Sequence, residues 1–199
     1  MNHIHDLNIN IEQLRQIQEM AKVLKKRFLI TESKPWTASS LAAELCFQIT
    51  HLSYSIINQE KNTCYIVPFK GTDKGINDEI ADILFDIMNL ANFLDLSVTE
   101  LLSQSIISQC KILFNLNDFY IQTINLSIQA GNLWDATFRQ DGYKHKVRNK
   151  KNNEIYIKKS LAGVLISILI LAKKLKINIL DSFLAMFKDA NQFLNNFAK

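Results

Sequence analysis

Apolar residues recur every three or four positions along most of the chain, which is the spacing of one face of an α-helix. Ile11, Leu14, Ile17 and Leu24 share such a face and predict a helix over residues 9–28. Further helices are predicted over residues 37–57, 78–93, 97–114, 118–139, 158–175 and 181–197. No stretch alternates with period two for long enough to predict a sheet, so the predicted fold class is all-α.

Breaks between these helices carry turn and capping residues. Pro35 ends the first helical region, and residues 58–75 read as a loop in which residues 64–67 could form one short strand. Ser97 and Glu100 have the spacing of a capping box, in which each side chain satisfies a backbone N–H of the first helical turn. Residues 140–153 are polar and basic and are predicted as a second long loop.

The sequence repeats when it is shifted by 81 residues. Identical residues then pair as Ala81/Ala162, Leu84/Leu165, Ile87/Ile168, Leu90/Leu171, Ala91/Ala172 and Leu94/Leu175. The same shift pairs Gln48 with Gln129 and Leu52 with Leu133. The alternative explanation is a chance match of two apolar stripes. The repeat predicts two copies of one helical unit. The first copy, with an extra helix before it, occupies residues 1–116, and the second occupies residues 117–199. The two copies are expected to pack as a bundle about a pseudo-two-fold axis.

Composition narrows the class of protein without naming a function. Of the 199 residues, 48% are hydrophobic and 21% are charged, which is typical of a globular chain and too apolar for disorder. The net charge of +4 is too small to predict nucleic acid as a partner. Three cysteines without metal-ligand spacing, and an N-terminus unlike a signal peptide, predict a cytoplasmic protein with reduced thiols. The most apolar run, residues 161–172, is shorter than the roughly 20 residues of a membrane span, so no membrane contact is expected.

Acidic residues gather in the first predicted copy. Glu79, Asp82 and Asp86 have helical spacing and are expected on one face. Glu44, Gln48 and His51 are expected to share a face of the preceding helix. If the two faces oppose each other, the carboxylates need a cation between them, and oxygen ligands suit Mg²⁺ or Mn²⁺. The alternative is that Glu79 and Asp82 only complement the positive end of a helix.

The segment Asp78-Glu79-Ile-Ala-Asp82-Ile-Leu, with its continuing apolar stripe, resembles the second motif helix of the MazG-like all-alpha nucleoside triphosphate pyrophosphohydrolases. Proteins of that family carry E-x-x-E on one helix and E-x-x-D on the next. The resemblance extends over about residues 14–102 and implies a metal-dependent cleavage of a nucleotide to a monophosphate and pyrophosphate. By motif position, Glu79 and Asp82 match the E-x-x-D pair, and Glu44 is the third candidate catalytic and metal-binding residue.

The first motif departs from the family pattern. If Glu44 is its first glutamate, Phe47 stands where the second is expected; otherwise Gln48 and His51 occupy the two positions. In either alignment at least one carboxylate ligand is lost. Gln48 can still offer a neutral oxygen. His51 would suit Mn²⁺ better than Mg²⁺; the alternative is a helix-surface or interface histidine. Asp86 is a further candidate ligand.

The second copy keeps the apolar stripe and loses the charges. The repeat places Asn125, Gln129, Asn132, Ser160 and Gly163 at the positions of the acidic motif, so no second metal site is expected there. The chain is thus expected to be a pyrophosphohydrolase with one working site. The alternative is a MazG-like pseudoenzyme that acts as a nucleotide-binding or protein-interaction scaffold. A homodimer is possible in either case, because the family usually acts as a dimer.

A basic run lies between the two predicted helices of the second copy. Lys144, Lys146 and Arg148 could reach across the pseudo-two-fold axis and neutralise triphosphate charge. Weak nucleic-acid binding and an ordinary solvated loop are the two alternatives for this segment.

Overall fold

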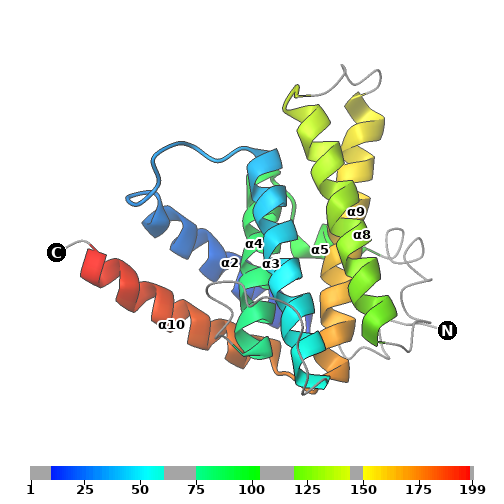
Figure 1. The fold of residues 1–199 in the computed structure, drawn as a ribbon. Coiled ribbons are helices and arrows are strands. Elements are labelled where there is room, and N and C mark those ends of the chain that lie inside the picture. Colours follow the sequence, from blue (N-terminus) through cyan, green and yellow to red (C-terminus); the bar gives the residue numbers. More distant parts are fainter. Residues whose placement is uncertain (1–9, 61–74, 104–118, 144–149, 198–199) are drawn as a thin grey trace.

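The computed structural model describes residues 10–60, 75–103, 119–143 and 150–197, and all regular structure within these ranges is helical. The helices are α2 (Ile11–Phe28), α3 (Ala38–Glu60), α4 (Ile76–Phe93), α5 (Val98–Leu101), α8 (Phe119–Gln140), α9 (Lys150–Lys174) and α10 (Ile179–Phe197) (Figure 1). The predicted all-α class is therefore confirmed. The predicted helix over residues 97–114 is corrected at its described end, because α5 ends at Leu101 and residues 102–103 are not helical. Residues 104–114, and the predicted strand at residues 64–67, fall outside the described residues.

Helix α9 corrects the predicted second loop. The helix begins at Lys150, inside the segment predicted as a loop over residues 140–153 and eight residues before the predicted start at 158. Its first turns are polar and largely exposed, and burial begins only at Ile157. Asn153 Nδ2 also donates a hydrogen bond to the Ala136 carbonyl oxygen at 3.2 Å. Because these turns extend beyond the core, they lack the apolar period from which the helix was predicted.

Four long helices surround the core. Helix α3 packs against α4 and α8, and α9 packs against the same two helices, so α3, α4, α9 and α8 form a closed ring of neighbours (Figure 1). Fully buried apolar side chains fill the space between them, including Leu45, Ile49, Ile83, Leu133 and Leu165. Helices α2 and α10 both pack on α4 outside this ring. Helix α4 is therefore contacted from both sides, and twelve of its 18 residues are buried.

Helix α9 is long and apolar enough to span a membrane by length and composition alone. In this fold 78% of its apolar window is buried inside the protein, and every residue from Ser160 to Ala172 is buried. A core helix of a soluble protein has the same composition. The segment therefore forms one wall of the bundle core.

A contact from the end of α8 fixes the start of α3. The Asp141 carboxylate accepts a hydrogen bond from the backbone N–H of Ser39 at 2.8 Å, 102 residues earlier in the chain. Backbone N–H groups in the first turn of a helix have no partner within the helix, so a carboxylate there satisfies one of them and complements the helix dipole. This contact joins the second half of the chain to the helix that carries Glu44.

Backbone features recur at an interval of 81 residues. Helices α3 and α8 begin at Ala38 and Phe119, and α4 and α9 end at Phe93 and Lys174. Helices α5 and α10 begin at Val98 and Ile179. One residue in the turn before α5 and one in the turn before α10 have a positive φ: Asp95 at 56° and Lys176 at 58°. Among the described residues other than glycine, these two alone have a positive φ. The predicted 81-residue shift therefore aligns helix boundaries as well as apolar residues.

The predicted capping box is present at the start of α5. The Ser97 hydroxyl accepts from the Glu100 backbone N–H, and the Glu100 carboxylate accepts from the Ser97 N–H. Lys158 of α9 binds the same carboxylate at 3.1 Å. The Ser97 backbone hydrogen bond, followed by the Lys158 contact, lowers the pKa of Glu100 to about 2.

Glu100→Gln is expected to lower the melting temperature slightly at pH 6 and not at pH 2. A carboxyl whose folded pKa is lowered stabilises the fold above its ordinary pKa near 4.5, and this stabilisation is lost as the pH falls through about 2. Melting curves of both proteins between pH 2 and pH 6 measure the difference. A difference that stays constant over this range would contradict the assignment.

Candidate functional site

A cleft of about 1010 Å³ lies between α2 with the segment that follows it, α3, α4 and α10. Arg27 helps to hold α10 in place, because its guanidinium donates hydrogen bonds to Asn191 and, at 2.7 Å, to Asn195. Charged and polar residues of the lining are Lys25, Glu32, Lys34, Ser40, Glu44, Gln48, Asp78, Asp82, Asp86, Asn89 and Asp189. Apolar walls come from Phe28, Trp36, Phe85, Met186 and Phe193. The volume is that of a pocket for a small molecule or a cofactor.

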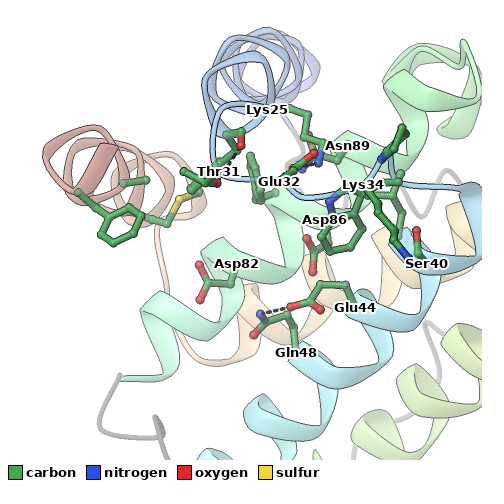
Figure 2. A pocket seen from close by; sticks show the side chains of 18 of the residues that line it. Lys25, Thr31, Glu32, Lys34, Ser40, Glu44, Gln48, Asp82, Asp86 and Asn89 are labelled. Carbon is green, nitrogen blue, oxygen red and sulfur yellow. Dashed lines mark hydrogen bonds and ion pairs between the residues drawn. The ribbon is translucent and has the colours of Figure 1, made fainter. Parts of the chain in front are cut away.

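Two helices bring the predicted acidic residues together in this cleft. Asp82 and Asp86 project from α4, and Glu44 and Gln48 project from α3 into the same space (Figure 2). Gln48 Nε2 donates a hydrogen bond to Glu44 Oε1 at 3.2 Å. Helical spacing explains this arrangement, because residues four apart lie one turn above each other. The predicted opposition of acidic faces is thus found for these four residues.

Asp86 has the least favourable environment among these carboxyl groups. The residue is only 6% exposed, and its Oδ2 has no hydrogen-bond partner in the described part of the chain. Burial raises the pKa of Asp86 well above its ordinary value, and the nearby charges of Glu44 and Asp82 raise it further. Lys25 acts in the opposite direction. A positive ligand at this position would satisfy the oxygen and offset the repulsion.

Glu79 and His51 are placed together, but they do not line the cleft. Glu79 Oε2 lies 3.9 Å from His51 Nδ1, and Glu79 is only 1% exposed. The expected single face of Glu79, Asp82 and Asp86 is therefore corrected for Glu79. Glu79 lies one turn before Ile83, so it begins the core-facing stripe of α4, whereas Asp82 and Asp86 lie on the neighbouring stripe.

The oxygen atoms that line the cleft are of the type that binds Mg²⁺ or Mn²⁺, although the side chains that carry them do not converge on one point. In residues 10–60, 75–103, 119–143 and 150–197, no three His, Cys, Asp or Glu side chains form a group that could hold a metal ion. The carboxylates of Glu44, Asp82 and Asp86 and the amide oxygen of Gln48 nevertheless provide hard oxygen ligands in one cleft. The unsatisfied Asp86 Oδ2 is the atom that most favours a bound cation.

Sequence reasoning did not select several polar residues of the cleft, among them Lys25, Glu32 and Asn89. Lys25 forms an ion pair with Glu32, and Lys25 Nζ lies 4.6 Å from the centre of the Trp36 ring. Asn89 lines the same cleft one turn after Asp86. Lys25 and Glu32 are separated by the end of a helix, so no periodic pattern relates them.

The remaining predictions concern the basic run and the second copy. Lys144, Lys146 and Arg148 fall outside the described residues. In the second half of the chain, the positions that match Gln48 and Asp82 are Gln129 and Gly163. A Cβ atom added to Gly163 would lie 2.9 Å from Gln129 Oε1, so the Gln129 side chain already fills the space beside this glycine.

We compared the chain with models of protein families, with curated proteins and with solved structures, and none of them matches it.

Proposed function

We propose that the cleft binds a nucleoside triphosphate together with Mg²⁺ or Mn²⁺ and hydrolyses it to a nucleoside monophosphate and pyrophosphate. One observation carries this proposal: the buried Asp86 carboxyl, with an unsatisfied oxygen in the described structure, lies beside Glu44 and Asp82 in a cleft of about 1010 Å³. Repelling carboxylates lower the stability of the empty protein and are typical of sites that bind a cation.

The charge of the cleft makes the cation necessary for such a substrate. Six acidic and two basic side chains line it, so a triphosphate alone would be repelled. Glu44, Asp82 and Asp86 would hold the cation, with Gln48 as a neutral oxygen donor. A bound divalent cation would neutralise phosphate charge and would lower the pKa of a water molecule bound to it.

The protein's own residues would then orient the substrate. Lys34 provides positive charge at the exposed rim of the cleft, where it can contact the outer phosphates. Water attacks the α-phosphorus, the bond from that phosphorus to the bridging oxygen breaks, and pyrophosphate leaves. The aromatic walls exclude water from the remainder of the substrate.

We further propose that the chain consists of two MazG-like copies related by a pseudo-two-fold axis, of which the second is silent. The 81-residue interval between helix boundaries and between the two positive-φ turns supports this relation. Asn125, Gln129, Ser160, Gly163 and Ser167 occupy the positions of Glu44, Gln48, Glu79, Asp82 and Asp86. The second copy would thus complete the bundle and, through Asp141, fix the start of α3.

A non-catalytic scaffold that binds a nucleotide or a protein is the second candidate function. The observation that favours it is the absence, in the described ranges, of three converging metal ligands. Glu79 also belongs to the core-facing stripe rather than to the cleft lining. Such a protein would bind its ligand in the same cleft and release no product.

Thermal melting with a panel of nucleoside triphosphates, with and without Mg²⁺ or Mn²⁺, tests the proposed function. A metal-dependent rise in melting temperature accompanied by pyrophosphate release is the expected result. A rise without pyrophosphate would establish the scaffold, and the absence of any rise would overturn nucleotide binding in both forms.

Gln48→Glu is expected to strengthen metal binding, because it adds a fourth carboxylate beside Glu44, Asp82 and Asp86. The Mn²⁺ concentration for half-maximal pyrophosphate release should fall about tenfold, the equivalent of ~1.4 kcal/mol. Gln16→Glu, on the exposed face of α2, adds the same charge outside the cleft and serves as the control. An equal change in the two variants would contradict a specific role for position 48.

A further inference from the structure

Two hydrogen-bond acceptors at one end of the cleft lack donors among the described residues. Asn89 is 5% exposed, and its Oδ1 is buried without a partner. The Glu32 side chain is 13% exposed; its Oε1 binds Lys25, whereas its Oε2 is buried without a partner. Leaving a buried acceptor unsatisfied is unfavourable, so both atoms favour a ligand that donates hydrogen bonds.

The contacts of Lys25 show that these acceptors belong to one part of the cleft. Lys25 binds Glu32, lies over the Trp36 ring and is near enough to Asp86 to affect its pKa. Asn89 follows Asp86 by one turn of α4 and lines the same cleft (Figure 2). The acceptors are thus at the α2 end, beyond the carboxylates of Glu44 and Asp82.

Aromatic rings border this end of the cleft. Phe28 and Phe85 meet edge to face with ring centres 6.0 Å apart, and Trp36 lies on the segment that follows α2. Flat apolar walls beside a small number of polar atoms are characteristic of a site for a planar heterocycle. A phosphate group is disfavoured next to Asn89 Oδ1 and Glu32 Oε2, because acceptor atoms would face its oxygens.

We propose that this end of the cleft selects nucleobases with an amino group at position 4 of a pyrimidine or position 6 of a purine, namely cytosine or adenine, through hydrogen bonds to Asn89 Oδ1 and Glu32 Oε2. This inference rests on the proposed nucleotide-binding function and names its substrate class. Uracil and hypoxanthine carry a carbonyl oxygen where cytosine and adenine carry the amino group, so they would present an acceptor to an acceptor. A site built to bind a donor discriminates strongly against the analogue that lacks it.

Isothermal titration calorimetry of the full chain with matched nucleotides tests the inference. CTP is compared with UTP, and ATP with ITP, in Ca²⁺ so that turnover does not interfere with binding. The amino member of at least one pair should bind about tenfold more tightly or better. Equal affinities within both pairs, or tighter binding of the carbonyl members, would overturn the inference and leave the proposed function intact. No binding of any of the four would overturn both.

Asn89→Leu then tests the assigned residue. The variant keeps the side-chain size and removes the acceptor, so CTP or ATP should lose its advantage while UTP and ITP bind as before. Asn196→Leu, on the exposed face of α10, is the matched control and should leave all four affinities unchanged. A preference that survives in Asn89→Leu would overturn the role of Asn89. Should this variant fail to fold, the comparison of nucleotides on the unmodified chain still decides the inference.

Discussion

Asp86→Asn is expected to raise the melting temperature of the metal-free protein and to abolish metal-dependent pyrophosphate release. The substitution keeps the shape of the side chain and removes a buried carboxyl that is repelled by Glu44 and Asp82. We expect a stability gain of about 1 kcal/mol, or roughly 2–4 °C for a chain of this length. Activity should fall by about a hundredfold or more, because a metal ligand is lost.

The pH dependence of stability provides a separate test of the same variant. Because the pKa of Asp86 is raised in the folded protein, the fold retains this proton at pH values where the unfolded chain has lost it. The Asp86 carboxyl therefore destabilises the folded protein as the pH rises above 3.8, the ordinary pKa of an aspartate. This destabilisation increases until the pH reaches the raised pKa of Asp86 in the folded protein. The advantage of Asp86→Asn over the unmodified chain should grow over that range and vanish in stronger acid.

Glu19→Gln is the control for both measurements. Glu19 is exposed on α2 and lies outside the cleft lining, so removing its charge should change neither the melting temperature nor the rate substantially. If Asp86→Asn lowered the melting temperature, or if it retained full metal-dependent activity, the assignment of Asp86 as a metal ligand would be contradicted. A gain in stability together with a loss of activity is the combination expected of a residue retained for function.

The sequence was sufficient to predict the helices because their apolar faces have a clear period. The start of α9 was mispredicted, because residues 150–156 extend beyond the core and carry no apolar stripe. Capping residues gave the best boundary, since Ser97 and Glu100 form the box that their spacing predicted. The 81-residue shift, found from identical core residues, also relates the ends of α4 and α9 and the starts of α5 and α10, but not the starts of α4 and α9.

The candidate site was predicted only where helical spacing relates its members. Glu44, Gln48, Asp82 and Asp86 follow such spacing on two helices, and they do meet in the cleft. Glu79 was misplaced because a helix face is wide: a position near its edge can belong to the core-facing stripe or to the cleft. Asn89 continues the helical spacing of Asp82 and Asp86, but as an uncharged residue it was not singled out. Glu32 lies on the segment after α2, and no local pattern encodes the path of that segment.

Phe183→Ala is expected to be the most destabilising of the substitutions considered. Phe183 is fully buried and is the largest of the buried side chains, and α10 has only two other buried residues, Ser182 and Leu194. Removing a buried phenylalanine ring costs about 3–5 kcal/mol, because apolar contact is lost and a cavity is left. For this chain length the melting temperature should fall by roughly 10 °C.

The same substitution should weaken nucleotide binding at temperatures where the bundle is still folded. Helix α10 contributes Met186, Asp189 and Phe193 to the cleft, and Phe183 is its main apolar anchor against the core. Phe197→Ala removes an identical ring from the same helix at a position that is 57% exposed and outside the cleft lining, so it should alter neither property. A binding loss in Phe183→Ala at 15 °C, with helical circular dichroism preserved, would show that α10 acts as a wall of the site. Equal binding by both variants would confine the role of Phe183 to stability and would mean that α2, α3 and α4 suffice to bind the ligand.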